Sequence, residues 1–398
     1  MDLPLYEQIY NYLVQKIRDG ELSSGDRVPS EKELAEQFQV SRITSKKALE
    51  LLAMHRLVER VQGKGSFVAE SLPDLSQVKP LHDYEPSGST GKSRAGADDG
   101  KIIAFVLPDF GDSYGLRLIH GVEERCSKLG IKMFLKLTYD RPEEEEEAIR
   151  SFLRLGVDGF IVFPVHGEHY NSELLRLVLD KHPLVLIDRY LKGIAAAAVY
   201  TDNRRSAFEL TNALFDGGAS LIGFISPPAE NTSTIEDRLA GFTDAYAARG
   251  IGLKSEYVIT KLYSTLPRAF GTERVRYDVE TVKTFIERNP ELDAFVVTEY
   301  NLALVVKEAL QSLGKRVPED HAVVCFDSPD EPFGNHPFTH VRQDEYEMGR
   351  RAVDLLQMQW EKQDVPLHNM IPYSIVAGRS AATVRNEAQH GSITKIEA

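Results

Sequence analysis

The stretch Gly25-Asp26-Arg27-Val28-Pro29-Ser30-Glu31-Lys32-Glu33-Leu34-Ala35 decides the fold of the N-terminal part of the chain. A small, polar turn leads into Ser30 and Glu33, which have the spacing of a capping box. In that motif the two side chains each bond the other residue's backbone at a helix start. The spacing predicts a helix that starts at Ser30 and carries Leu34 and Phe38 on its apolar face.

Further elements are predicted on both sides of this stretch. An i, i+4 apolar stripe from Leu5 to Ile17 predicts a helix that ends near Gly20. Ser41 can cap a third helix, so two short helices meet across a tight turn as a helix-turn-helix. The β-prone runs 57–61 and 66–68, with a glycine-rich tip between them, predict a hairpin, or wing.

Positive charge gathers in the third helix and the wing. Residues 40–69 carry six Lys and Arg against two Glu, which gives +4, whereas the whole chain has a formal net charge of −13. The third helix opens with Arg42, Thr44 and Lys46, donors to phosphates and base edges at the positive end of a helix dipole. These groups indicate DNA binding, although the acidic average argues against it.

The ordered set of motifs over residues 3–69 resembles the GntR winged helix-turn-helix. In that family the recognition helix enters the major groove and the wing tip reaches the minor groove. Where the family usually has Thr-Thr-Val-Arg after Ser-Arg, this chain has Ile43-Thr44-Ser45-Lys46, so a point charge replaces a bidentate guanidinium. By position, the resemblance implies these DNA contacts: Lys32, Arg42, Thr44, Lys46, Gln62, Gly63 and Lys64.

The length of 398 residues predicts two or three domains. Residues 71–100 are rich in Pro, Ser and Gly and predict a flexible linker after a domain at 1–70. The two cysteines, Cys126 and Cys325, are too few for a disulfide framework or a zinc cluster, and no run is long enough to span a membrane. We therefore expect a soluble cytoplasmic protein that does not interact with a membrane, needs no cofactor and holds no metal.

After the linker, short apolar runs alternate with amphipathic helical segments. This alternation predicts parallel sheets covered by helices on both faces. Ligands of such folds bind beyond the carboxyl ends of the strands. The residues that follow the runs are mixed carboxylates, hydroxyls and guanidiniums with an aromatic, which suit a polyhydroxylated ligand such as a sugar or, alternatively, the acid and base of an enzyme.

Motifs such as 103–109, 186–190 and 237–242 resemble the effector domain of LacI-type repressors. The resemblance implies a type I periplasmic-binding-protein fold over 101–385, with two α/β lobes, three crossovers and a ligand cleft. The first lobe is expected at about 101–199 and 342–361, the second at about 200–341 and 362–385, and a tail at 386–398. Matching positions imply a sugar-binding role for Asp112, Tyr114, Arg189, Arg238, Glu299 and Asp327.

Two other features have plain interpretations. Glu143 to Glu147 follow Pro142, which predicts the solvated acidic first turn of a helix. His166 and His169 have a spacing that two metal ligands could use, but a third ligand is not evident, so we interpret both as polar loop or pocket groups.

The combined features predict a ligand-responsive regulator: a homodimer that binds double-stranded operator DNA as a repressor. The resemblance implies release when a sugar, with L-arabinose or another pentose as candidates, closes the cleft. The competing classes are a sugar receptor without DNA function and a carbohydrate-acting enzyme. The basic wing argues against the first class, and an enzyme would need a precisely spaced carboxylate pair.

Overall fold

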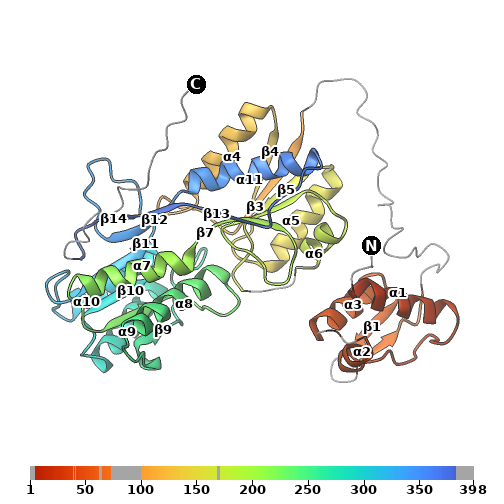
Figure 1. Ribbon diagram of the computed structural model, residues 1–398, viewed down its shortest axis with the longest axis horizontal. Coiled ribbons are helices and arrows are strands. Elements are labelled where there is room, and N and C mark those ends of the chain that lie inside the picture. The colour runs from red at the N-terminus through yellow and green to blue at the C-terminus, as the bar shows by residue number, and fades with distance from the viewer. Residues whose placement is uncertain are drawn as a thin grey trace. The chain divides into compact units, whose positions relative to one another are not determined.

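The computed structural model describes residues 5–38, 40, 42–61, 65–72, 100–167 and 171–381. The chain divides into two compact units, residues 1–96 and 97–398. Most of the expected linker and the whole expected tail lie outside the described residues. Each unit is described by itself below, with the element labels of Figure 1.

The N-terminal unit is the predicted winged helix-turn-helix. The capping box is confirmed: Ser30 Oγ accepts from the Glu33 backbone N–H at 3.3 Å, and Glu33 Oε2 accepts from the Ser30 N–H at 2.7 Å. A core of buried aliphatic residues joins the helices to the hairpin, in which β1 and β2 pair antiparallel. The elements are α1 (Leu5–Arg18), α2 (Glu31–Gln37), α3 (Arg42–Met54), β1 (Val58–Val61) and β2 (Gly65–Val68).

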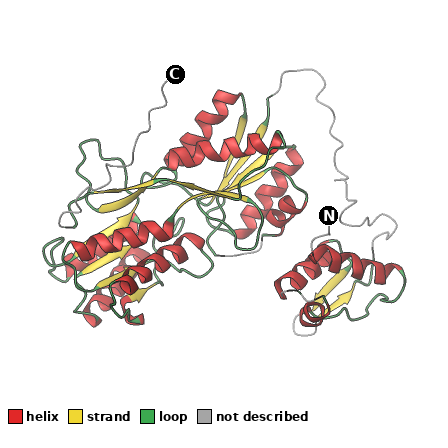
Figure 2. Cartoon of the chain, viewed as in Figure 1, coloured by secondary structure: helices red, strands yellow, loops and turns green. Residues whose placement is uncertain are grey.

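The second unit holds two six-stranded sheets with helices on both faces (Figure 2). The first sheet has the order β13-β7-β6-β5-β3-β4 and the second β14-β12-β11-β10-β8-β9. In the first sheet the strands are β3 (Ile102–Leu107), β4 (Lys132–Leu137), β5 (Gly159–Val162), β6 (Leu184–Ile187), β7 (Ala197–Thr201) and β13 (His368–Ile371). In the second they are β8 (Ile222–Ile225), β9 (Val258–Ile259), β10 (Ala294–Val297), β11 (Ala322–Phe326), β12 (Thr339–Gln343) and β14 (Tyr373–Val376).

In each lobe, alternate strand residues lie on opposite faces of the sheet and pack into two apolar layers. In lobe 1, Ile103 and Phe105 pack on one face with α4 and α11, while Ala104 and Val106 pack on the other with α5 and α6. In lobe 2, α9 and α10 cover one face and α7 and α8 the other. The helices are α4 (Leu116–Leu129), α5 (Pro142–Leu155), α6 (Ser172–Leu179), α7 (Asn203–Asp216), α8 (Ser233–Ala248), α9 (Thr272–Arg288), α10 (Tyr300–Ser312) and α11 (Glu345–Trp360).

The chain crosses between the lobes at residues 201–203, 343–345 and 371–373, in keeping with the three crossovers that the resemblance implies. One expected boundary is wrong. The resemblance places residues 362–385 in lobe 2, but β13 pairs in parallel with β7 in the lobe 1 sheet, and only β14 joins the lobe 2 sheet. The reason is that β13 and β14 are separated by a single residue, so the last crossover lies inside one extended segment.

The helices α4 and α11 approach each other unusually closely. A Cβ on Gly121 would lie 2.1 Å from the Tyr346 carbonyl oxygen, and a Cβ on Gly349 would lie 2.4 Å from the Leu118 carbonyl oxygen. Both distances are far below van der Waals contact, so any side chain at either position would force the helices apart. The pairing matters for the site, because Glu345 at the start of α11 accepts the Gly115 N–H just before α4 at 2.6 Å.

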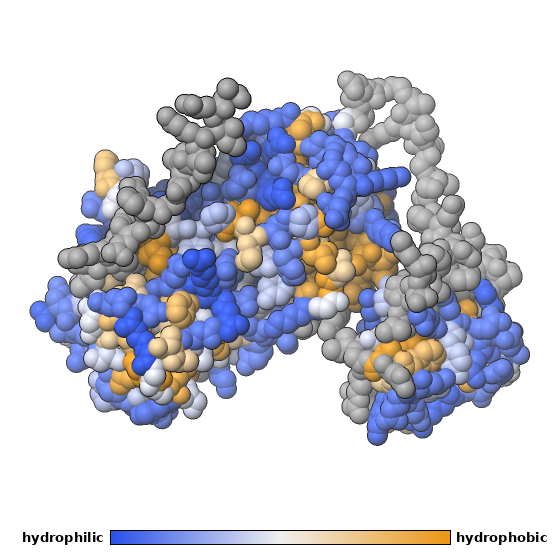
Figure 3. Space-filling view, in the orientation of Figure 1, coloured by the Kyte–Doolittle hydropathy of each residue, from blue (hydrophilic) through white to orange (hydrophobic). Residues whose placement is uncertain are grey.

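The surface agrees with the composition. The face drawn in Figure 3 is hydrophilic over most of its area, as expected for a chain with 27% charged residues. Among the described residues, none of the helices is both long and apolar enough to cross a membrane. Cys126 and Cys325 are both buried and unbridged.

Candidate functional site

The turn between α2 and α3 is fixed by a residue that sequence reasoning did not single out for this purpose. Ser45 is fully buried, and its hydroxyl donates to the Glu31 carbonyl oxygen at 2.6 Å. The bond ties the first turn of α3 to the start of α2. Ser45 therefore holds the two helices of the helix-turn-helix together, which explains a small hydroxylated residue at this place.

The predicted DNA contacts are placed as follows. Lys32 is exposed on α2 with its Nζ 3.8 Å from Glu36, and Lys46 is on α3 with its Nζ 3.9 Å from Glu50. Thr44 is half-buried, one turn into α3. Arg42 is the first residue of α3, but its side chain lies outside the described part, as do Gln62, Gly63 and Lys64 at the wing tip.

Lys47 differs from these residues. Its ammonium lies 3.8 Å from the centroid of the Tyr6 ring, a cation–π distance. The contact attaches α3 to α1 inside the domain. Lys47 thus contributes to packing, and Lys46 is the neighbour that remains the better candidate for a DNA contact.

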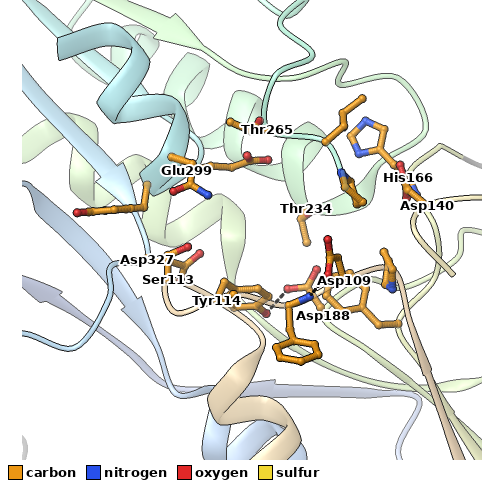
Figure 4. Close-up of a pocket in the computed structure, with 18 of the residues that line it drawn as sticks. Asp109, Ser113, Tyr114, Asp140, His166, Asp188, Thr234, Thr265, Glu299 and Asp327 are labelled. Carbon is orange, nitrogen blue, oxygen red and sulfur yellow. Dashed lines mark hydrogen bonds between the residues drawn. The ribbon is translucent and has the colours of Figure 1, made fainter. Parts of the chain in front are cut away.

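In the second unit a cavity of about 270 Å³ lies between the lobes, at the carboxyl ends of both sheets. Figure 4 shows polar side chains from both lobes around this space. Carboxylates line it from both sides, with three guanidiniums, several hydroxyls and a few apolar groups. The acidic and basic lining residues are Asp109, Asp140, Asp188, Glu299, Asp327, Arg189, Arg238, Arg268 and His166.

On the lobe 1 side, Asp188 directly follows β6 and is 5% exposed. Its carboxylate accepts from the Tyr114 hydroxyl, and burial raises the pKa of Asp188 above its usual range. Arg189 donates from Nη1 to the Pro164 carbonyl oxygen at 2.8 Å and lies 4.9 Å from the Phe163 ring centroid. Its Nε is buried and has no hydrogen-bond partner among the described residues.

On the lobe 2 side, Arg238 is 6% exposed and held from two directions. Its Nε donates to Asn203 Oδ1 and its Nη1 to the Thr298 carbonyl oxygen, each at 2.8 Å, and the guanidinium lies 3.9 Å from the Phe326 ring centroid. Asp327 follows β11 and accepts from Gln343 Nε2 at 3.1 Å.

Burial raises the pKa of both carboxyl groups on this side. The pKa of Asp327 rises to about 8 because the carboxyl is desolvated, although nearby Arg238 opposes the shift. The pKa of Glu299 rises for the same reason. Protonated carboxyls and guanidiniums donate hydrogen bonds and ionised carboxylates accept them. The cavity therefore offers both donors and acceptors to the hydroxyls of a sugar.

A loop from lobe 1 reaches lobe 2 beside the cavity. His166 Nε2 lies 2.7 Å from the Pro228 carbonyl oxygen, and the Gly167 N–H donates to Thr232 Oγ1 at 3.2 Å. Burial lowers the pKa of His166. No group of three or more metal-ligating side chains exists among the described residues, and His169 lies outside them.

The start of this loop is fixed by Glu145 of α5. Glu145 Oε2 accepts from the Val165 N–H at 3.0 Å and Oε1 accepts from Asn171 Nδ2 at 2.8 Å. The residue is 1% exposed, so the expectation of a fully solvated acidic turn at 143–147 is wrong at this position. Burial raises the pKa of Glu145 to about 7.

Five of the six predicted sugar contacts line the cavity: Tyr114, Arg189, Arg238, Glu299 and Asp327. The sixth is not brought there, because Asp112 is exposed while Ser113 beside it lines the cavity. The prediction missed Asp140, Gln343 and residues 265–270. Asp140 follows β4, so it lies where ligands of such folds bind, beyond the carboxyl end of a strand. Residues 265–270 belong to a loop after β9, which has only two residues and therefore no apolar run that could be recognised in the sequence.

Comparisons with known proteins agree with this two-part architecture. Residues 5–68 match the model of the bacterial regulatory proteins of the gntR family, and residues 211–381 match that of a periplasmic binding protein-like domain. The chain therefore joins a GntR-family domain to a periplasmic-binding-protein-like domain. The second match covers lobe 2 from within α7 onward, the last two crossovers, and α11 and β13 of lobe 1. The equivalent strand order of the lobe 1 sheet completes the fold.

Similar proteins match the chain over most of its length. The arabinose metabolism transcriptional repressor of Geobacillus stearothermophilus is 27% identical over 375 residues, which are 91% of this chain and 93% of that protein. That of Halalkalibacterium halodurans is 26% identical and covers 88% of each chain.

Solved structures share the fold. The transcription regulator CcpA of Lactococcus lactis has a TM-score of 0.60 at 23% identity and covers 71% of this chain and 99% of its own. A complex of the transcriptional regulator CelR with cellobiose has a TM-score of 0.62 at 20% identity and covers 86% of this chain and 92% of its own.

Proposed function

We propose that the protein is a cytoplasmic, homodimeric transcriptional repressor of carbohydrate-utilisation genes. Its winged helix-turn-helix binds operator DNA, and a sugar in the cleft between the lobes releases it. The observation that carries this proposal is the cavity at the carboxyl ends of both sheets, whose charged groups suit a hydroxylated ligand, in a chain that also carries a helix-turn-helix. The relatives that span about nine tenths of the chain are repressors of arabinose metabolism, which makes L-arabinose the first sugar to test.

The mechanism follows from the two units. One winged domain reads a short half-site, so two copies on a symmetric dimer multiply affinity and specificity. A sugar that contacts both lobes stabilises the closed arrangement of the cleft, and operator affinity falls if the closed form binds DNA less well. Such coupling is typically worth about 1–3 kcal/mol.

The DNA-binding part is tested by replacing Arg42 and Lys46 together with alanine. Loss of two phosphate or base contacts should weaken specific operator binding at least a hundredfold, measured by fluorescence anisotropy at one fixed salt concentration. Lys16→Ala is the matched control, since Lys16 lies at the far end of α1 and pairs with Glu21 at 2.7 Å. Unchanged operator affinity in the double variant would contradict the proposed DNA contacts.

The sugar-binding part is tested by thermal unfolding with L-arabinose, other pentoses and hexoses. A sugar that binds the native state raises its unfolding midpoint. Turnover of a bound sugar, followed by chromatography, would instead favour the carbohydrate-acting enzyme, because the cavity holds several carboxyl groups.

A further inference from the structure

The segment 263–270, which we call the lid segment, covers one side of the cavity. It connects β9 to α9, and five of its residues line the cavity: Thr265, Leu266, Pro267, Arg268 and Phe270. The other walls are formed mainly by residues that follow the central strands. The lid segment is thus a wall of the cavity that is not formed by residues directly after a central strand.

The base of the lid segment is firmly held. The backbone N–H groups of Tyr263 and Ser264 both donate to Asp278 Oδ2 of α9, at 2.9 and 2.7 Å. Asp278 is 1% exposed, and the Ala269 N–H closes a turn onto the Leu266 carbonyl oxygen at 2.8 Å. One buried carboxylate therefore fixes where the segment leaves lobe 2.

The other end of the lid segment touches lobe 1. The Arg268 guanidinium carbon lies 3.2 Å from the centroid of the Tyr139 ring, which follows β4. Tyr139, Asp140 and Arg268 all have left-handed backbone, with φ of 53°, 60° and 58°. Left-handed backbone in residues other than glycine costs free energy and persists where surrounding contacts enforce it, often at ligand clamps. Tyr139 itself does not line the cavity, whereas Asp140 next to it does.

The lid segment faces the cavity with mainly apolar side chains, whereas the opposite walls mix aromatic residues such as Phe110 and Phe163 with charged groups. It presents Leu266, Pro267 and Phe270 to a cavity whose other walls hold five carboxyl groups. Phe270 is 51% exposed although it lines the cavity, so part of its ring has no protein cover. A sugar ring has hydroxyl groups around its edge and an apolar C–H face, and aromatic and aliphatic side chains favour contact with such a face.

We propose that residues 263–270 form a lid that determines sugar affinity and selectivity. Its apolar side chains pack on the C–H face of a polyhydroxylated ring, and the contact of Arg268 with Tyr139 is the lock that holds the lid against lobe 1. The inference rests on the proposed function, that a sugar binds in this cavity. The lid acts on ligand escape, so its contribution is expected in the dissociation rate.

The lock is tested in the full-length protein with Arg268→Ala, Tyr139→Ala and Tyr139→Phe. Calorimetry gives the Kd of the sugar identified by the thermal screen, starting with L-arabinose, and stopped-flow mixing gives the rates. Loss of the cation–π contact in Arg268→Ala or Tyr139→Ala should raise Kd about tenfold through faster dissociation, with little change in association. Tyr139→Phe keeps an aromatic ring under the guanidinium and should behave as wild type.

The apolar face is tested with Phe270→Ala, which should weaken sugar binding. It should also reduce the difference in Kd between sugars that differ only in the orientation of one hydroxyl. Tyr277→Ala is the matched control, because Tyr277 is an aromatic of the next helix that is 68% exposed and does not line the cavity. It should bind as wild type.

The outcomes separate the two proposals. Wild-type dissociation rates in Arg268→Ala and Tyr139→Ala, in a protein that still binds the sugar, overturn the lid and leave the proposed function intact. Equal losses in Tyr139→Phe and Tyr139→Ala also overturn it, because the lock needs only the ring. Failure of every pentose and hexose to bind the wild-type chain overturns the proposed function itself.

Discussion

The two lobes are built on one plan but present different faces to the cavity. Their sheets have equivalent strand orders, so β6 of lobe 1 corresponds to β11 of lobe 2. Each strand is followed at once by an aspartate with left-handed backbone, Asp188 with φ of 67° and Asp327 with φ of 64°. Aspartate tolerates this conformation better than most residues, and the backbone turn aims each carboxyl into the cleft.

The difference lies in how the neighbouring arginines are held. Arg238 of lobe 2 has two hydrogen bonds from two nitrogens and an aromatic ring beneath it. Arg189 of lobe 1 has one hydrogen bond, and its Nε has no hydrogen-bond partner in the described part of the chain. The lobe 2 wall of the cavity is therefore a preformed face, whereas Arg189 in the lobe 1 wall makes fewer hydrogen bonds and its Nε lies 3.8 Å from Asp188 Oδ2, so that wall is the less complete face.

The largest effect is expected from Arg238→Ala. It removes a donor from the preformed face and takes the Arg238 donors away from Asn203 Oδ1 and the Thr298 carbonyl oxygen. We expect sugar affinity to fall at least a hundredfold and the unfolding midpoint to drop, whereas Arg189→Ala should cost about tenfold in affinity with a small change in stability. Calorimetry and thermal unfolding measure both.

Arg204→Ala is the control for these variants, because Arg204 is a neighbouring arginine with an exposed side chain that pairs with Asp244 at 2.6 Å. It should leave sugar binding unchanged. If Arg189→Ala and Arg238→Ala were equally damaging, the distinction between a preformed and an incomplete face would be wrong.

A smaller effect is expected in the pH dependence of stability. The folded protein keeps the Asp327 proton to about pH 8, whereas the unfolded chain releases it near its ordinary pKa of about 4. The unfolded state thus binds fewer protons between about pH 4 and 8, so this group makes stability fall as the pH rises through that window. Asp327→Asn removes this pH-dependent contribution to the free energy of unfolding.

Urea unfolding at pH 5, 6, 7 and 8 tests this directly. The stability of Asp327→Asn relative to wild type should improve steadily from pH 5 to 8 and level off above that. A constant difference across the series would show that Asp327 is not protonated in the folded state. Asp188→Asn should give the same trend, because burial also raises the pKa of Asp188.

The smallest effects concern two equivalent helices. Glu145 of α5 and Asp278 of α9 are both buried carboxyls that accept backbone N–H groups of a cavity loop. Glu145→Gln and Asp278→Asn each leave one acceptor and should cost about 1–2 kcal/mol of stability by urea unfolding. Sugar affinity should fall only a few-fold, and more in Asp278→Asn if the lid matters more than the lobe 1 loop.

The sequence predicted the fold well where local signals are strong. The capping box at Ser30 and Glu33 and the apolar runs of β3, β6, β10 and β11 lie where they were expected. The strands β7, β9, β12, β13 and β14 were missed or only partly indicated, because they are short or carry polar residues such as His340 and Asn369. Their place depends on pairing with strands far away in the sequence.

The site was predictable to the extent that it follows strand ends. Asp327 comes directly after an apolar run and was found, whereas Gln343 lies at the last position of a strand that the pattern hid. The resemblance to LacI-type repressors implies a sugar contact for Asp112, yet its neighbour Ser113 lines the cavity, because backbone direction decides which of two neighbouring side chains faces it. Burial of Glu145 could not be read from a run of five glutamates.

The close pair α4 and α11 changes what a routine alanine scan would report. At most positions alanine deletes contacts, but at Gly121 and Gly349 it adds a methyl group where backbone atoms already lie within 2.4 Å. Such a variant acts as a wedge that forces the two helices apart, so its phenotype reports a steric clash and not the loss of a contact. The wedge would move Glu345 away from the Gly115 N–H that it accepts next to Tyr114. Two glycines that do not line the cavity would thus register in a genetic screen alongside the residues that do.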